Sequence, residues 1–155
     1  MMVGLKQPGQ RFIRCSGTLG WGLPGAIGVK CALPDRPVLC ITGDGGLYYH
    51  ISELETAARL GINLVVVVNN NGALSQTKSG FDAAYAGQPY QGAHELWKYR
   101  DTNFAAVAES LGCLGIRVER RADLPAALAR AAAAERPALV DVVTDIDALP
   151  ITPWG

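Results

Sequence analysis

The feature that most constrains the fold is the aliphatic run LVVVV at residues 64–68, which ends at the polar run NNNG. A strand that is apolar on both faces is typical of the centre of a parallel sheet, because helices cover both sides of such a sheet. Residues 51–60 carry apolar side chains at helical spacing, and Gly61 ends that segment. A helix followed by a strand of this kind indicates one step of an α/β fold.

The same alternation continues along the chain. We expect further helices at residues 23–33, 103–111 and 124–134, and further strands at residues 38–42, 116–119 and 138–143. This order predicts the α/β class, with a doubly wound parallel sheet in a single domain over residues 1–155. Ligands of such sheets bind at the carboxyl ends of the strands. The motif GDGG at residues 43–46 and the asparagine run at residues 69–71 are both expected there.

A carboxylate between glycines at a strand end suits a divalent cation beside a phosphate. The backbone N–H groups around Asp44 would attract phosphate oxygens, but the carboxylate would repel them unless a cation lies between. Mg²⁺ prefers a few protein oxygens together with phosphate oxygens. The amides of the asparagine run are neutral oxygen ligands at the next strand end, so the pattern predicts a Mg²⁺–phosphate site.

Composition excludes several other classes of protein. Of the 155 residues, 49% are hydrophobic and 18% are charged, which is typical of a globular chain. Fourteen basic residues balance fourteen acidic ones, so nothing favours nucleic acid. No apolar run is long enough to span a membrane. The four cysteines form no CxxC pair; we expect Cys31 and Cys40 to be buried and the protein to be cytoplasmic.

The spacing of these motifs resembles that of the thiamine diphosphate enzymes, and in particular the C-terminal diphosphate-binding domain of acetolactate synthases and 2-oxo-acid decarboxylases. That family has GDG, then a helix and an apolar strand, then an asparagine pair, and here Asn71 lies 27 positions after Asp44. The segment GTLGWGLPGAIG at residues 17–28 is similar to the glycine-rich segment of the same family. Residues 103–112 and 137–145 look like its later helix and last strand, so the resemblance covers nearly the whole chain.

The resemblance implies thiamine diphosphate and Mg²⁺ as cofactors. It assigns the metal to the side chains of Asp44 and Asn71 and to the backbone carbonyl of Ala73. The extra asparagine leaves Asn70 as an alternative ligand, and the spacing from Asp44 favours Asn71. Contacts with the cofactor are implied for Gly43, Gly45, Gly46 and Leu47.

The glycine-rich segment has two further implied roles. Leu19 occupies the position of the bulky apolar side chain that holds the cofactor bent, and the Gly17 carbonyl would accept a hydrogen bond from the aminopyrimidine. Because of their position after the metal ligands, Gln76, Thr77 and Phe81 are candidate contacts for a small 2-oxo-acid substrate.

The resemblance also implies what the chain needs from elsewhere. Family members receive an activating glutamate from a pyrimidine-binding domain, which a chain of 155 residues is too short to contain. Only 16 residues precede Gly17, too few for the usual first strand and helix. We therefore expect a split subunit, a fragment of a longer enzyme or a remnant, which works in a hetero- or homo-oligomer with a pyrimidine-domain protein and is inactive alone.

Other interpretations stay open at this point. GWGLPG at residues 20–25 also matches the GxGxxG fingerprint of NAD-binding Rossmann domains. A non-catalytic domain kept for subunit contacts is a second alternative. His50 and His94 are candidate acid–base residues, and residues 88–100 are a candidate substrate loop. Arg117, Arg120 and Arg121 are expected to form a solvated basic edge.

Overall fold

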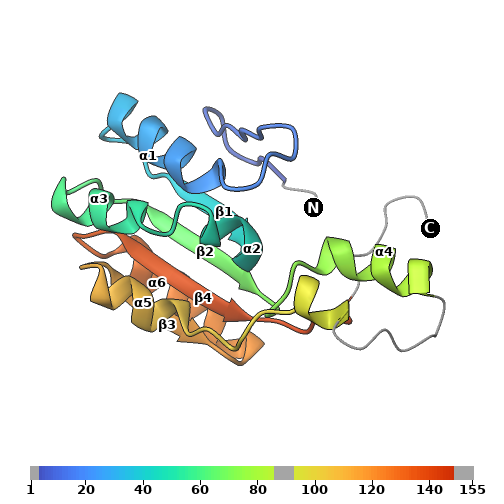
Figure 1. Cartoon of the computed structure of the whole chain (residues 1–155). Helices are drawn as coiled ribbons and strands as arrows, with labels where there is room; N and C mark the ends of the chain where they lie inside the picture. Colours follow the sequence, from blue (N-terminus) through green and yellow to red (C-terminus); the bar gives the residue numbers. More distant parts are fainter. Residues whose placement is uncertain (1–3, 86–92, 149–155) are drawn as a thin grey trace.

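A four-stranded parallel sheet forms the centre of the protein. The computed structural model describes residues 4–85 and 93–148. Its strands lie side by side in the order β1-β2-β4-β3, and each neighbouring pair is parallel (Figure 1). The strands are β1 (Leu39–Gly43), β2 (Val65–Asn70), β3 (Leu114–Val118) and β4 (Ala138–Val143). The predicted α/β class and parallel sheet are confirmed.

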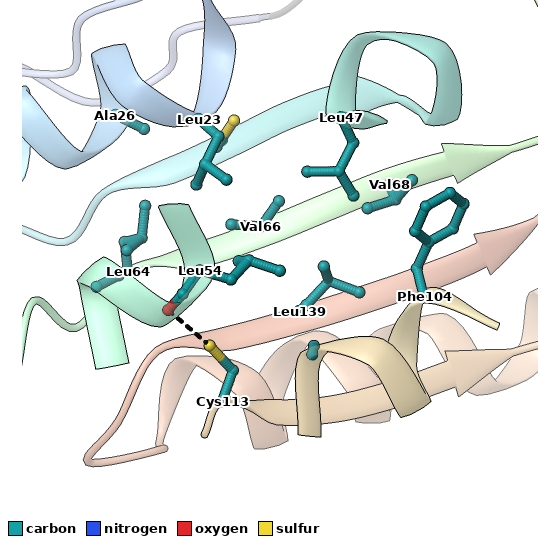
Figure 2. Close-up of a cluster of buried hydrophobic side chains, with 13 residues drawn as sticks. Leu23, Ala26, Leu47, Leu54, Leu64, Val66, Val68, Phe104, Cys113 and Leu139 are labelled. Carbon is teal, nitrogen blue, oxygen red and sulfur yellow. Dashed lines mark hydrogen bonds between the residues drawn. The ribbon is translucent and has the colours of Figure 1, made fainter. Parts of the chain in front are cut away.

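Helices pack on both faces of this sheet. The α1 (Gly22–Ala32), α3 (Glu53–Arg59) and α5 (Phe104–Ser110) helices contribute side chains to one buried cluster, whereas α6 (Leu124–Ala132) packs in a second cluster on the opposite face. In the first cluster, Leu54 and Phe104 meet the aliphatic side chains of β2 and β4 (Figure 2). The β2 run is apolar throughout because Val66 and Val68 face this cluster while Val65 and Val67 face the other.

The register brings the ends of β1 and β2 together. Gly43, the last residue of β1, lies beside Asn69 of β2. A short helix, α2 (Asp44–Tyr48), begins directly after β1, and α4 (Ser75–Tyr85) begins shortly after β2. Figure 1 shows the arrowheads of β2 and β4 pointing toward α4, so both polar motifs lie at the carboxyl edge of the sheet as predicted. Two short 3₁₀ helices, η1 (Ala93–Leu96) and η2 (Arg121–Asp123), complete the described elements.

Some details differ from the predictions. The third strand begins two residues before the predicted start, at Leu114, because Pro137 O accepts the Leu114 N–H and brings this end of β3 into the sheet. Cys40 is buried as expected, but Cys31 is exposed because α1 turns that residue away from the sheet. Among residues 4–85 and 93–148, no helix has both the length and the apolar character needed to cross a bilayer.

Candidate functional site

Asp44 is a buried carboxylate at the junction of β1 and α2. Its side chain is nearly inaccessible, and its Oδ1 accepts a hydrogen bond of 2.8 Å from the Gly45 N–H. Its Oδ2 accepts one of 2.9 Å from the Ala73 N–H, which belongs to the loop after β2. Asp44 therefore links the two strand ends directly. Burial raises the pKa of Asp44 above its ordinary value, and hydrogen bonds from the backbone N–H groups partly oppose that rise.

The three consecutive asparagines after the valine run have different surroundings. Asn69 Oδ1 accepts a hydrogen bond of 2.9 Å from Thr144 Oγ1. Asn70 is buried, and its Nδ2 donates to Asp141 Oδ1 at 2.9 Å and to Thr102 O at 3.1 Å. Its Oδ1 accepts from the Gly72 N–H at 3.3 Å. The amide of Asn70 is thus occupied within the protein, which argues against Asn70 as the metal ligand.

The side-chain oxygen of Asn71, Oδ1, is the strongest indication of a ligand site. This oxygen is buried and has no hydrogen-bond partner within the part of the chain that the structure describes. Such an orphaned acceptor is costly unless something outside the protein binds it. The described residues hold one other such oxygen, on Asn63, which precedes β2 at the opposite end of the strand. Asn71 and Asp44 line the same cavity.

Two glycines of the GDGG motif lie close to neighbouring side chains at the edge of the cavity. A Cβ on Gly45 would lie 3.0 Å from Leu74 Cδ1 and 3.1 Å from Tyr99 Oη. A Cβ on Gly46 would lie 2.9 Å from Thr42 Oγ1. Side chains at either position would press against these neighbours at the edge of the cavity. The motif therefore leaves room for a ligand to approach the backbone closely.

The glycine-rich segment forms the other side of the cavity. The cavity has a volume of about 970 Å³ and is lined by Gly17 and Leu19 as well as by the GDGG motif. Leu19 Cδ2 lies 4.0 Å from where a Cβ on Gly46 would be, so Leu19 reaches the motif. Gly17 and Gly20 have φ angles of 125° and 87°, which only glycine adopts readily. The structure thus brings together Gly17, Leu19, Gly43, Asp44, Gly45, Gly46, Asn71, Ala73 and Gln76.

Three of the predicted contacts lie elsewhere. Leu47 is 1% exposed and points into the hydrophobic cluster (Figure 2), so its side chain does not line the cavity. Thr77 and Phe81 lie on α4 outside the cavity lining, and the Phe81 ring stacks on Tyr85. His50 and His94 are both exposed and do not line the cavity. Of the proposed substrate loop, residues 88–92 lie outside the described residues.

Sequence reasoning missed the segment that braces the loop after β2. Lys98 forms an antiparallel bridge with Ala73, supported by hydrogen bonds of 2.7 Å from Leu74 N–H to Trp97 O and from Tyr99 N–H to Gly72 O. Burial, followed by the negative charge of Asp44, raises the pKa of the Tyr99 hydroxyl. No pattern in the sequence indicates this bridge, because the segment is short, polar and distant along the chain.

The prediction for Arg117 was wrong. Its side chain is only 19% exposed, and its Nη1 lies 2.9 Å from the buried Asp141 carboxylate. Arg120 is 80% exposed and follows the prediction of a solvated edge. Arg117 lies on β3 directly opposite Asp141 of β4, and this register places its guanidinium inside the protein.

These residues suit a divalent cation bound together with an anionic group. The candidate donors are one carboxylate and one amide oxygen without a partner among the described residues, and such oxygen ligands are the kind that Mg²⁺ prefers. A cation would also balance the Asp44 charge that burial disfavours. No group of three His, Cys, Asp or Glu side chains gathers within residues 4–85 and 93–148 to form a different kind of metal site.

Fold and site together define a parallel α/β domain with a buried carboxylate and an amide oxygen without a partner among the described residues at the carboxyl ends of its strands. Residues 2–142 match the model of the family described as thiamine pyrophosphate enzyme, C-terminal TPP binding domain. The chain belongs to this family, and within it the chain is similar to acetolactate synthases.

Individual relatives agree with this assignment. The acetolactate synthase large subunit of Haemophilus influenzae is 38% identical over 116 residues, which are 75% of this chain and 20% of that protein. That of Mycobacterium tuberculosis is 35% identical over 133 residues, or 85% of this chain and 22% of that protein. The solved structure of the Rhodococcus jostii RHA1 thiamine diphosphate-dependent 4-hydroxybenzoylformate decarboxylase matches with a TM-score of 0.72 and 32% identity over 83% of this chain and 24% of that one. The chain therefore spans between a fifth and a quarter of these relatives.

The dinucleotide-binding alternative finds no support. A Rossmann fingerprint needs a strand immediately before the glycine turn. Within residues 4–21 the structure has no strand, and β1 comes only after α1. The GxGxxG match instead belongs to the longer glycine-rich segment that lines the cavity.

Proposed function

We propose that this chain binds thiamine diphosphate through Mg²⁺ and forms the diphosphate-binding part of a 2-oxo-acid decarboxylase or carboligase similar to acetolactate synthase. The side chains of Asp44 and Asn71 and the carbonyl of Ala73 would hold the ion. The observation that carries the proposal is the buried Asn71 Oδ1, which has no partner in the part of the chain that the structure describes and belongs to a residue that lines the same cavity as Asp44. In support, the chain is similar to enzymes that use this cofactor.

The proposal assigns a role in cofactor binding to each of the main residues around the cavity. Thiamine diphosphate, when bound, provides the thiazolium that accepts negative charge as a 2-oxo acid loses CO₂. Asp44 and Asn71 anchor the diphosphate end through the ion, while the glycines let the backbone approach it. Leu19 presents an apolar side chain beside Gly46 and would fix the bend of the cofactor. The Gly17 carbonyl would orient the aminopyrimidine.

The remainder of the catalytic site would come from a pyrimidine-binding domain outside these residues. The chain covers 20% to 22% of the two acetolactate synthase large subunits compared above, so most of such an enzyme has no counterpart here. We propose that a pyrimidine-domain protein or subunit provides the activating glutamate and completes the substrate pocket. A small 2-oxo acid is the substrate class, and its identity would depend on that partner.

Titration calorimetry of the purified chain tests the cofactor assignment. We expect thiamine diphosphate to bind with Mg²⁺ present and to bind far more weakly with EDTA. Asp44→Ala should abolish the Mg²⁺-dependent part, because it removes the charged ligand. Glu109→Ala, which removes an exposed carboxylate on α5 away from the cavity, should bind as the unmodified chain does. Equal cofactor affinity for Asp44→Ala and the unmodified chain would refute the assignment.

Tryptophan fluorescence separates this function from dinucleotide binding. Trp21 lines the cavity and is 37% exposed, so a ligand there should change its emission. Quenching by thiamine diphosphate with Mg²⁺, and not by NADH, is the expected result. Quenching by NADH alone would favour the Rossmann interpretation instead.

A further inference from the structure

Asp141 is a fully buried carboxylate on β4 that lies outside the cofactor cavity. Its Oδ2 accepts hydrogen bonds from the Phe104 N–H at 3.0 Å and from Arg117 Nη1 at 2.9 Å. Its Oδ1 accepts from Asn70 Nδ2 at 2.9 Å. A buried charge persists only where it is paired and hydrogen-bonded, and Asp141 meets both conditions. It therefore joins β3, β4, the start of α5 and the end of β2 at one point.

Asn70 connects Asp141 to the loop after β2 through hydrogen bonds on both sides of its amide. Two acceptors, Asp141 Oδ1 and Thr102 O, face its amide nitrogen, which fixes the amide in one orientation. The amide oxygen must then point the other way, where it accepts the Gly72 N–H at 3.3 Å. Gly72 lies between Asn71 and Ala73, the residues proposed to bind Mg²⁺. The orientation of the Asn70 amide therefore affects the positions of Asn71 and Ala73.

We propose that Asp141 is a positioning residue for the metal loop, which we define as residues 70–73. By fixing the Asn70 amide, Asp141 directs the Asn70 oxygen to the Gly72 N–H and so holds Asn71 and Ala73 where the ion needs them. The inference rests on the proposed function of this loop. It adds a group that contacts neither the ion nor the cofactor and acts through Asn70 alone.

Two variants disrupt the series of hydrogen bonds from Asp141 through Asn70 to Gly72, each at a different residue. Asp141→Asn keeps the shape but offers one acceptor oxygen where three donors now face a carboxylate. The amide nitrogen of the new side chain would face Asn70 in place of Oδ1. The Asn70 amide would then rotate by about 180° to present its oxygen to that nitrogen, and this oxygen would no longer accept the Gly72 N–H. Asn70→Ala removes the link itself and leaves Asp141 with Arg117 and Phe104. Glu119→Gln is the matched control, because it removes another ion pair of Arg117, at 3.0 Å, without reaching Asn70.

Mg²⁺ affinity in the presence of saturating thiamine diphosphate is the first measurement. Residues that orient metal ligands typically contribute about 10- to 100-fold to affinity. We expect the Mg²⁺ dissociation constant to rise by about that factor in Asp141→Asn and Asn70→Ala. It should stay unchanged in Glu119→Gln. Calorimetry on the EDTA-treated chains, with Mg²⁺ as the titrant, gives these values.

The second measurement needs neither metal nor cofactor. The backbone N–H resonance of Gly72 should shift in the NMR spectra of Asp141→Asn and Asn70→Ala and stay in place in Glu119→Gln. Should Asp141→Asn not fold, Asp141→Glu takes its place, because it keeps the charge beside Arg117 but moves the carboxylate relative to Asn70, and it should likewise shift the Gly72 resonance and weaken Mg²⁺ binding. Variants that lose only thermal stability, with Mg²⁺ affinity and the Gly72 resonance unchanged, would overturn the proposal. If the unmodified chain takes up no Mg²⁺ with thiamine diphosphate, the proposed function fails and the positioning role falls with it, even where the Gly72 resonance shifts.

Discussion

Three identical residues in a row, Asn69, Asn70 and Asn71, differ in role because a strand turns successive side chains to opposite sides. Asn70 faces inward and its amide meets Asp141, Thr102 and Gly72. Asn69 lies on the outer side with Thr144. Asn71 follows the last residue of β2, where the ladder ends, and its oxygen has no partner among the described residues. The site therefore depends on where the strand stops as much as on residue type.

Asn71→Ala should separate stability from function. Without ligand the substitution removes a buried acceptor that makes no hydrogen bond among the described residues, so the free energy of unfolding should rise by about 1 kcal/mol. Asn70→Ala breaks three hydrogen bonds and should cost about 1–3 kcal/mol. Urea unfolding in EDTA measures both. Mg²⁺-dependent cofactor binding should be lost in Asn71→Ala, and its retention would transfer the ligand role away from Asn71.

The four cysteines should divide into two reactive and two protected thiols. Cys15 and Cys31 are exposed, whereas Cys40 and Cys113 are buried. Burial raises the pKa of Cys40 to about 11 and also raises the pKa of Cys113, so little thiolate forms at pH 8. Ellman's reagent at pH 8 should modify two thiols promptly and the other two only after unfolding. Prompt reaction of all four in the native protein would contradict this packing.

At the scale of elements, periodicity predicted the segments with a clear apolar pattern and missed two helices that have none. The valine run and the helix before it followed from apolar spacing alone, and both are present. The helix α2 has five residues, begins in the glycine motif and has no periodic pattern to detect. The helix α4 was missed because its sequence, SQTKSGFDAAY, is polar and contains a glycine. Both missed elements begin at or just after the proposed metal ligands, so the local conformation of the candidate site was the least predictable part.

Close packing of α5 on β3 depends on Gly115. A Cβ at this position would lie 2.0 Å from the backbone oxygen of Ala105, and a helix backbone cannot move aside cheaply. Gly115→Ala should therefore lower the free energy of unfolding by about 3 kcal/mol. Gly28→Ala is the matched control on α1, since its Cβ would meet nothing within 4 Å. The control should stabilise the protein by about 0.5–1 kcal/mol. Similar effects of the two substitutions in urea unfolding would refute the close approach of α5 and β3.

At the scale of the whole molecule, the site is assembled from segments that only the folded chain brings together. The two-part motif predicted that Asp44 and Asn71 lie at one edge of the sheet because the carboxyl ends of adjacent parallel strands must meet. The bracing segment around Tyr99 and the buried Asp141 network could not be read from spacing, since their contacts depend on loop paths and on strand order. Sequence thus predicted which residues meet at the carboxyl edge of the sheet, but not the contacts that hold their loops in place.

The isolated chain is expected to bind cofactor without turning over pyruvate. Among the described residues that line the cavity, Asp44 is the only carboxylate, and it is already assigned to the ion. No histidine lines the cavity within those same residues, so none of them can replace the activating glutamate that a pyrimidine-binding domain would provide. An assay of CO₂ release and acetolactate formation on the homogeneous chain should give no product, while calorimetry on the same sample shows cofactor uptake. Addition of a chain that carries the pyrimidine-binding region should restore turnover. Catalysis by the homogeneous chain alone would show that an acid–base group outside residues 4–85 and 93–148, or a second copy of the chain, completes the site.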